Sequence, residues 1–303
     1  MIVSWNTRKL LRECLASVVA QAPTEVVVVD NGSTDGSAAM VREEFPAVTL
    51  LLLGANPGYG AAANAGVRAC RSEHVLVLNS DTVLRPGGLA AMADVLDRSE
   101  RAAIVGPRIV SPDGSLQRSC YAFPGFLARV FRWEPFATAA ALVPGLRERY
   151  VGRWNYDRPG RVPWVLGAAL AIRRAAFEEV GGFDPSFRMY FEEVDLCYRL
   201  RLCGWDTLFA PVTEVIHIGG ASTRQRRSEM LAQYEISLIQ FHRRHHRGAA
   251  LALSLGTVRL LAGARLLRDT IRYRASPDGP RRASLAGDCA AWRKVLAGAA
   301  GSA

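Results

Sequence analysis

The first third of the chain alternates between short apolar segments and helical patterns, and this alternation is the strongest constraint on the fold. Each apolar segment is rich in β-branched residues or leucine and ends in polar residues or glycine, as at 2–3, 25–29, 48–53 and 75–78. Apolar residues at helical spacing follow, for example Leu11, Leu15 and Val18. Because strands that are connected through helices run parallel, this order predicts an α/β fold with a mostly parallel central sheet.

The segment Val75–Leu78 is typical of a strand that is buried on both faces, and it ends at Asn79-Ser80-Asp81. In an open α/β sheet, ligands bind outside the carboxyl ends of the strands. A carboxylate at this place, Asp81, can hold a divalent cation against a diphosphate. Alternatively, Asp81 caps the helix that follows. The loop by itself supports both interpretations.

The composition is that of a basic, globular protein. Half of the 303 residues are hydrophobic, 22% are charged and the net charge is +10. Basic surfaces attract the phosphates of nucleic acids, membranes or diphosphate ligands. Since no compact basic motif for nucleic acid occurs, we expect no nucleic-acid partner and favour a membrane surface and diphosphate ligands. Six cysteines without Cys-x-x-Cys spacing indicate reduced core residues in a cytoplasmic protein.

The second half of the chain is less regular. Residues 119–161 have no clear period and contain Trp133, Tyr150, Trp154 and Tyr156, which predicts either an irregular insertion that closes over a substrate or an exposed connection. Beyond them we expect strands at 162–173, 207–210 and 214–218, and helices at 174–180 and from about 191.

The helix expected from about 191 begins with Glu192, Glu193 and Asp195. Acidic residues in a first turn complement the helix dipole, or they form a functional cluster. Asp195 and Arg199 are one turn apart and are expected to pair.

The C-terminal residues 223–303 are predicted to be helical. We interpret the three histidines among arginines at 242–247 as a solvated basic segment rather than a metal site, because no carboxylate accompanies them. The apolar segment 249–267 is interrupted by Arg259 and Arg265, which favours a helix that lies in a membrane interface or docks on the rest of the protein. Without a run of 18 uncharged apolar residues we expect no transmembrane helix, and a strand at Ile2 leaves no room for a signal peptide.

Five motifs occur in a fixed order, at 30–36, 56–60 with Asn64, 78–81, 181–184 and 189–196. Together they resemble the family 2 inverting glycosyltransferases of the GT-A fold. The most similar branch is the bacterial rhamnosyltransferases that act on lipid-linked cell-wall or O-antigen precursors. The resemblance covers residues 1–245. It implies a GT-A catalytic domain at 1–222, with a C-terminal helical extension at 223–303 that associates peripherally with the inner face of the plasma membrane.

The resemblance also implies residue roles. The nucleotide sugar is expected to contact Ser4, Trp5, Asp30, Gly58, Gly60, Asn64, Asn79, Ser80 and Asp81. Asp81 matches the second carboxylate of a metal-binding Asp-x-Asp motif, whose first position is Asn79 here, and with His217 it is expected to hold Mg²⁺ or Mn²⁺. Glu193 matches the catalytic base, which is more commonly Asp. Glu192, Asp195 and Trp164 are expected to support the base or contact the acceptor.

The implied reaction is a single displacement with inversion. It moves a sugar, L-rhamnose from dTDP-rhamnose, onto a lipid-diphosphate-linked saccharide in cell-wall or surface polysaccharide assembly. One alternative is a transferase that uses a UDP-sugar, carrying GlcNAc, galactose or galactofuranose. Another is a non-catalytic nucleotide-sugar-binding assembly partner, which Asn79 and the Glu-Glu variant make conceivable. A nucleotidyltransferase is disfavoured, because Ser4-Trp5-Asn6-Thr7 is not a glycine- and arginine-rich loop.

Overall fold

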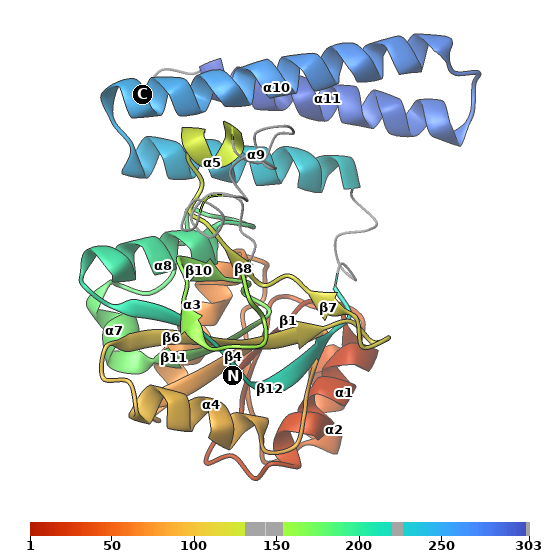
Figure 1. Ribbon diagram of the computed structural model, residues 1–303. Coiled ribbons are helices and arrows are strands. Elements are labelled where there is room, and N and C mark those ends of the chain that lie inside the picture. Colours follow the sequence, from red (N-terminus) through yellow and green to blue (C-terminus); the bar gives the residue numbers. More distant parts are fainter. Residues whose placement is uncertain (131–142, 144–153, 220–226, 301–303) are drawn as a thin grey trace. The chain divides into compact units, whose positions relative to one another are not determined.

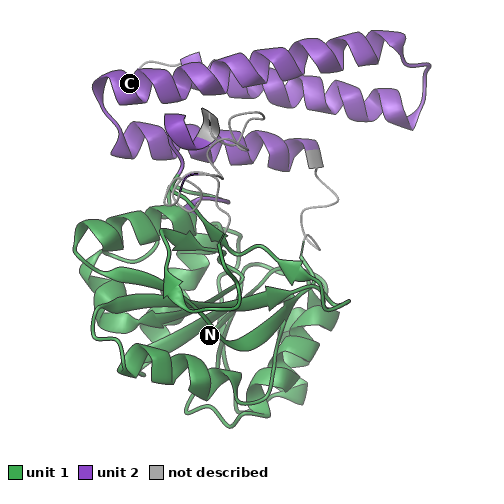
Figure 2. Cartoon of the chain, viewed as in Figure 1, with its two compact units in different colours: residues 1–123, 152–188, 192–222 green, residues 124–151, 189–191, 223–303 purple. Residues whose placement is uncertain are grey.

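The computed structural model describes residues 1–130, 143, 154–219 and 227–300 (Figure 1). The chain divides into two compact units (Figure 2). Unit 1 comprises residues 1–123, 152–188 and 192–222, and unit 2 comprises residues 124–151, 189–191 and 223–303. The expected domain boundary after residue 222 lies outside the described residues, as do Trp133 and Tyr150 of the expected insertion.

Unit 1 is built on a sheet with ten strands among the described residues. The main path runs in the order β3-β2-β1-β4-β11-β6-β12-β5, while β7 pairs with β6 and β9 pairs with β12. The strands of this sheet are β1 (Ile2–Ser4), β2 (Val27–Asp30), β3 (Thr49–Leu52), β4 (His74–Asn79), β5 (Thr82–Leu84), β6 (Ala102–Val110), β7 (Leu116–Gln117), β9 (Gly160–Arg161), β11 (Ala169–Arg173) and β12 (Asp206–His217). A separate two-stranded sheet pairs β8 (Cys120–Tyr121) with β10 (Trp164–Val165).

The helices of unit 1 connect these strands. They are α1 (Arg8–Val19), α2 (Ser37–Glu44), α3 (Tyr59–Ala69), α4 (Gly88–Asp97), α7 (Arg174–Glu179) and α8 (Glu192–Leu202). The first four strands along the main path pair in parallel, and β12 runs parallel to β6. β11 is antiparallel to both of its neighbours, β4 and β6. The predicted α/β fold with a mostly parallel sheet is therefore confirmed.

Three boundaries differ from the sequence prediction. The strand expected at 162–173 is interrupted at Gly167, so that β10 and β11 belong to different sheets. The two strands expected at 207–210 and 214–218 are one strand, β12, with a register shift between Phe209 and Glu214. Pro211, which has no N–H to donate to a ladder, lies within this shift. The pair Asn56-Pro57 favours a helix that starts at Pro57, but α3 begins at Tyr59, after Gly58.

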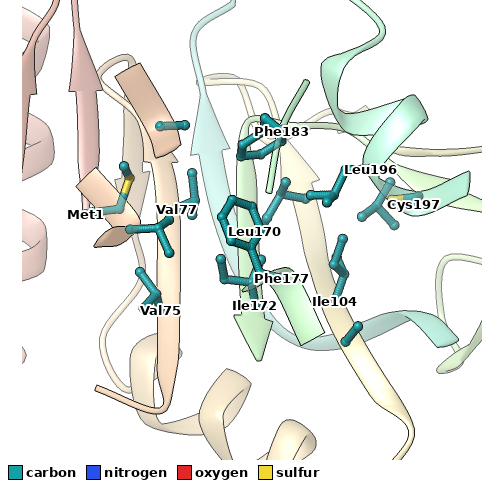
Figure 3. Close-up of a cluster of buried hydrophobic side chains, with 14 of the residues drawn as sticks. Met1, Val75, Val77, Ile104, Leu170, Ile172, Phe177, Phe183, Leu196 and Cys197 are labelled. Atoms are coloured by element: carbon teal, nitrogen blue, oxygen red, sulfur yellow. The ribbon is translucent and has the colours of Figure 1, made fainter. Parts of the chain in front are cut away.

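The central strands bury both of their faces, as predicted for Val75–Leu78. On one face, Val75 and Val77 of β4 join Leu170 and Ile172 of β11 in a cluster that also includes Phe183 (Figure 3). On the other face, the alternate residues of the same strands belong to a second cluster, which includes Leu76, Leu78, Ala169 and Ala171. Burying one such side chain stabilises a fold by about 1.5–3 kcal/mol. This two-sided core holds the ends of β4 and β11 in place.

Unit 2 contains the predicted C-terminal helices. Its helices are α5 (Phe126–Val130), α9 (Arg227–His245), α10 (Gly248–Ala275) and α11 (Pro280–Ala300). α10 and α11 are joined by a buried hydrogen bond, in which the Trp292 indole N–H donates to Asp269 at 3.0 Å. The Arg265 guanidinium lies 4.9 Å from the centre of the Trp292 ring.

Two sequence expectations concern the C-terminal helices, and the structure contradicts one of them, the solvated histidine-rich segment. In the described part of the chain, α10 is long and apolar enough to cross a membrane by length and composition, with a mean hydropathy of 1.5 over 18 residues of which 17% are buried. The expectation of no such helix was based on an unbroken uncharged run, which is a stricter criterion. The histidine-rich segment is not uniformly solvated, because His242 is fully buried and its Nδ1 lies 3.1 Å from Nδ1 of His246. All six cysteines lie in described ranges and are free.

Candidate functional site

The first two strands end side by side, at one polar edge of the sheet. β1 and β2 pair in parallel, with Ser4 opposite Asp30. The loops that follow them interlock, because the Asn6 N–H donates to Ser33 Oγ at 2.9 Å. Trp5 lies half-buried directly after β1. Residues expected to contact a nucleotide are thus brought together from segments 25 residues apart or more.

A chain of buried hydroxyl groups joins β1 to the loop after β4. Ser4 Oγ lies 3.1 Å from Thr7 Oγ1, which lies 2.7 Å from Ser80 Oγ. All three side chains are buried. Thr7 directly precedes α1, where threonine often caps a helix, but its side chain makes no cap hydrogen bond to α1. Its hydroxyl instead supports Ser80, the residue before Asp81.

Among the described residues, two buried acceptor atoms at the end of β2 have no hydrogen-bond partner. One Asp30 oxygen, Oδ1, accepts the Ser33 N–H at 2.9 Å. The other, Oδ2, is buried and has no hydrogen-bond partner within the described ranges, and the same holds for Asn31 Oδ1. Buried polar atoms are rarely left unsatisfied in folded proteins. These two oxygens therefore fit a ligand that offers N–H or hydroxyl donors, such as the base or ribose of a nucleotide.

The glycines of the 56–60 motif have packing reasons of their own. At Gly58, with φ of +104°, an added Cβ would lie 2.8 Å from the Arg188 carbonyl oxygen. At Gly60, an added Cβ would lie 3.1 Å from the Cβ of Phe183. From the sequence, both glycines are expected to let the nucleotide sugar approach the backbone. The structure shows the protein's own atoms where a Cβ would lie, so both glycines let the backbone pack against the turn that precedes α8, and their expected contact with the nucleotide sugar stays a prediction.

Asn64 fixes the same turn. Its side-chain Nδ2 donates to the Phe183 carbonyl at 2.7 Å, and its Oδ1 accepts the Phe183 N–H at 2.9 Å. The amide is 7% exposed. Both ends of the amide are bonded to one backbone residue, so the structure gives Asn64 the part of holding the turn, and its expected contact with the nucleotide stays a prediction.

Asp81 and His217 face each other across the pairing of β5 with β12. Thr82, the first residue of β5, pairs with His217, the last residue of β12. This register places Asp81 Oδ1 3.5 Å from His217 Nε2, with both side chains largely buried. Asn79, at the first position of the Asp-x-Asp motif, is the last residue of β4 and is partly exposed.

The Asp81–His217 pair fits a divalent cation that is completed by a ligand. Among the residues that the structure describes, no group of three or more His, Cys, Asp or Glu side chains is arranged to hold a metal alone. Mg²⁺ is commonly held by one or two carboxylates together with substrate phosphates and water. Mn²⁺ accepts the same oxygen ligands, and imidazole is a common ligand of transition metals. One carboxylate and one imidazole therefore suffice when a diphosphate supplies further oxygens.

Glu192 and Glu193 open α8, and one oxygen of each carboxyl group is buried without a partner in the described ranges. The Gly167 N–H, at the break between β10 and β11, faces Glu193 Oε1 at 3.4 Å. Burial raises the pKa of both carboxyl groups, and for Glu192 the neighbouring Glu193 adds to the rise. A carboxyl group with a raised pKa is a stronger base once it is ionised, which suits proton abstraction near neutral pH.

Asp195 and Trp164 support the region around α8. The predicted pair is confirmed: Arg199 Nε lies 2.7 Å from Oδ2 of Asp195, which is fully buried. The same guanidinium donates to the carbonyls of Val180 and Gly182. Trp164 donates its indole N–H to the Ala122 carbonyl at 2.9 Å. These contacts give both residues a part in holding loops near the site.

Comparison with known proteins gives the family. Residues 1–237 match the family described as Glycosyltransferase like family 2. A protein of Mycobacterium tuberculosis, N-acetylglucosaminyl-diphospho-decaprenol L-rhamnosyltransferase, is 33% identical over 284 residues, which cover 89% of this chain and 90% of that protein. The chain is a family 2 glycosyltransferase. The resemblance inferred from its five motifs is confirmed.

Further relatives of the glycosyltransferase include a low-salt glycan biosynthesis hexosyltransferase of Haloferax volcanii, which is 26% identical over 221 residues (72% of this chain and 66% of that protein). A mannosyltransferase from Pyrobaculum calidifontis, solved with GDP-Man and Mn²⁺, aligns with a TM-score of 0.54 at 18% identity, over 98% of this chain and 84% of that one. GalNAc-T7, solved with UDP, GalNAc and Mn²⁺, aligns with a TM-score of 0.53 at 19% identity, over 71% of this chain and 42% of that one. These likenesses show that the glycosyltransferase has the GT-A fold.

Proposed function

We propose that this glycosyltransferase moves L-rhamnose from dTDP-rhamnose onto a lipid-diphosphate-linked saccharide in cell-wall or surface polysaccharide assembly. The similarity to the mycobacterial rhamnosyltransferase supports this choice, because it extends over 89% of this chain rather than over the shared fold alone. The observation that carries the proposed site is the convergence of Asp30, the Asp81–His217 pair and Glu193 at one edge of the sheet. β1, β2 and β4 end there, and β11 begins beside the end of β4. The Gly167 N–H, two residues before β11, faces the Glu193 carboxyl group.

The nucleotide half of the donor is proposed to bind at the ends of β1 and β2. Asp30 Oδ2 and Asn31 Oδ1 are buried acceptors without partners in the described ranges, so they suit the N–H and hydroxyl groups of the base and ribose. Ser4 and Ser80 lie in the hydroxyl chain beside this place. Trp5 directly follows Ser4 and offers an aromatic face for the base.

The diphosphate half is proposed to bind with Mg²⁺ or Mn²⁺ at Asp81 and His217. When bound, the cation supplies positive charge that stabilises the departing nucleoside diphosphate. Asp81 and His217 would hold it in place from β5 and β12, which the hydrogen bond from the Ile218 N–H to the Asp81 carbonyl at 3.0 Å keeps in register. Because Asn79 occupies the first position of the Asp-x-Asp motif, Asp81 is the single charged residue of this motif.

Glu193 is proposed to be the catalytic base of an inverting displacement. It takes the proton of the acceptor hydroxyl as that oxygen forms its bond to the anomeric carbon, while the bond from this carbon to the diphosphate breaks. The pKa of Glu193 is raised by burial, and the Gly167 N–H at 3.4 Å orients one of its oxygens. Glu192 and Trp164 remain proposed supports of the base or the acceptor, and Asp195 a support through Arg199.

The helices at 223–303 are proposed to form an extension that binds the cytoplasmic face of the plasma membrane peripherally. Four large apolar side chains of α10 are exposed: Leu253 (50%), Leu260 (71%), Leu267 (64%) and Ile271 (60%). Their spacing of seven, seven and four residues places them on one side of the helix. Residues 227–300 contain thirteen Arg and Lys but five Asp and Glu, a net charge of +8. This charge favours an anionic lipid surface and disfavours a second copy of the same helices.

The experiment that tests the proposed function is a transfer assay with the full-length protein. Purified enzyme is incubated with a synthetic GlcNAc-diphosphate-lipid and with dTDP-rhamnose, UDP-GlcNAc, UDP-galactose or UDP-galactofuranose, with Mg²⁺, Mn²⁺ or EDTA. We expect rhamnosylated lipid from dTDP-rhamnose, with inverted configuration by NMR, and little product in EDTA. Turnover of a UDP-sugar alone would refute dTDP-rhamnose as the donor, while the assignment to glycosyltransferase family 2 would still hold. Binding without turnover of any donor would favour a non-catalytic assembly partner.

A further inference from the structure

Gln117 joins β7 to the end of β12, 100 residues further along the chain. Both β7 and β12 pair with β6, where Ile109 lies opposite Gln117 on one side and Val215 on the other. From this position the Gln117 side chain reaches His217 twice. Its Nε2 lies 2.6 Å from the His217 carbonyl oxygen, and its Oε1 lies 3.0 Å from His217 Nδ1.

The carbonyl contact identifies the two ends of the Gln117 amide. A backbone carbonyl only accepts hydrogen bonds, so the amide atom beside it must be the NH₂ group. The same NH₂ group donates to Ser111 Oγ at 3.1 Å, a second contact that agrees with this orientation. The atom beside His217 Nδ1 is therefore the amide oxygen, which can only accept.

The orientation of the amide sets the tautomer of the neutral imidazole. Since the Gln117 oxygen accepts, Nδ1 of His217 must carry the proton that is donated to it. The other nitrogen, Nε2, then has a free lone pair, and it lies 3.5 Å from Asp81 Oδ1. Two acceptors that face each other at this distance suit a divalent cation that both atoms can bind. Two atoms that each lie about 2.1 Å from one ion are about 3 to 3.5 Å apart when they are neighbouring ligands.

We propose that Gln117 is a positioning residue that holds His217 in the tautomer able to bind a divalent cation together with Asp81. This inference rests on the proposed metal role of Asp81 and His217. Without Gln117, the imidazole is free to carry its proton on Nε2 and to donate it to Asp81. That hydrogen bond occupies both of the atoms that would otherwise bind the cation. Gln117 thereby keeps the pair open to metal.

The test compares three variants of the full-length protein by Mn²⁺ binding, measured from the electron paramagnetic resonance signal of free Mn²⁺, alone and with dTDP or UDP. Gln117→Met keeps the size of the side chain but removes both hydrogen-bonding groups. Gln117→Glu keeps an acceptor for Nδ1 but cannot donate to the carbonyl. Ser111→Ala is the control, because it removes the other partner of the amide and leaves His217 untouched.

We expect Gln117→Met to raise the Kd for Mn²⁺ by about 10- to 100-fold, the usual effect of losing a residue that orients a metal-binding histidine. Gln117→Glu should stay within about threefold of wild type, and Ser111→Ala should be unchanged. In the transfer assay, the loss of activity in Gln117→Met should become smaller at high Mn²⁺ concentration. A general folding defect would not be relieved in this way. Circular dichroism and thermal unfolding establish that each variant is folded.

Two results would overturn the inference while the proposed function stands: wild-type Mn²⁺ affinity in Gln117→Met, or equal weakening in Gln117→Met and Gln117→Glu. The second result would mean that Gln117 acts by holding the β12 backbone. Asp81→Asn distinguishes failure of the underlying metal role. If this variant binds Mn²⁺ as tightly as wild type, the proposed cation site is wrong, and the inference about Gln117 falls with it.

Discussion

Asn64 and Phe183 exchange two hydrogen bonds, one in each direction, between a helix and a turn that are separated by 119 residues in the chain. The Asn64 amide thus serves the backbone of Phe183 as a partner strand would. It ties α3 to the turn that leads toward α8. Gly182 leaves room for this contact, because an added Cβ there would lie 2.6 Å from Asn64 Oδ1.

Asn64→Ala should lower the free energy of unfolding by about 2–4 kcal/mol, because it leaves two buried backbone groups of Phe183 without partners. Asn64→Asp keeps an acceptor for the Phe183 N–H, but it can donate to the Phe183 carbonyl only where the carboxyl is protonated. Its loss of stability should therefore be smaller at pH 5 than at pH 8. Urea unfolding at pH 5 and pH 8 measures both variants. A loss below about 0.5 kcal/mol in Asn64→Ala would show that other groups satisfy Phe183.

Glu193→Gln should reduce turnover by about 10²- to 10⁴-fold, the usual contribution of a general base, while donor binding is retained. Glu193→Asp shortens the side chain by one methylene and should keep measurable activity. Steady-state kinetics, with donor affinity from calorimetry, separates the two effects. Glu192→Gln is the comparison variant: its proposed supporting role should cost less activity than loss of the base, since adjacent residues of a helix point about 100° apart. An inactive Glu192→Gln beside an active Glu193→Gln would place the base one residue earlier.

Glu192→Gln should stabilise the protein at high pH. Burial raises the pKa of Glu192 in the folded protein, so the folded state binds the proton more tightly than the unfolded chain does. Wild-type stability is therefore lost as pH rises from the ordinary glutamate pKa toward the raised value, by at most about 1.4 kcal/mol per pH unit. Glutamine does not titrate, so the stability of the variant relative to that of the wild type should increase between pH 4 and pH 8. Thermal unfolding across this range checks the sign, and a gap that narrows with rising pH would contradict it.

The exposed stripe of α10 should control binding to membranes. Leu260→Glu/Leu267→Glu is expected to lower co-sedimentation with vesicles of phosphatidylglycerol and phosphatidylcholine by about tenfold or more, because it places two charges in the apolar contact. The control is Leu202→Glu/Val212→Glu, which makes the same charge change at exposed apolar residues of unit 1. High salt should weaken wild-type binding in part. Wild-type protein that never sediments with these vesicles would rule out the membrane surface.

Features with a local cause were predictable from the sequence. α1 follows from the helical spacing of Leu11, Leu15 and Val18, which are all buried in the structure. The Asp195–Arg199 pair follows from one turn of helix. The burial of β4 on both faces follows from its unbroken apolar run. These inferences need only neighbours in the chain.

Features that depend on distant contacts were not predictable. At the break, the Gly167 N–H faces the carboxyl group of Glu193, which lies 26 residues away in the chain. The glycine pattern at 58 and 60 indicated a close approach, but nothing in it identified Arg188 and Phe183 as the groups that approach. Gln117 offered no signal at all, because a lone glutamine before an irregular segment has no meaning until its distant histidine partner is known.

The position of β11 has a consequence for how the chain folds. It pairs with β4 on one side and β6 on the other, while β4 and β6 are not neighbours in the sheet. A nascent chain that has emerged only as far as β6 therefore holds the four strands β3, β2, β1 and β4 with an exposed edge at β4, while the described strands that pair with β6 are still to come. The sheet cannot be completed until β11 is synthesised, about 60 residues after the end of β6. Contacts between strands so far apart in the chain form slowly. Fragments that end before Ala169 should accumulate as aggregation-prone species on the ribosome, and chaperone binding should peak at that length.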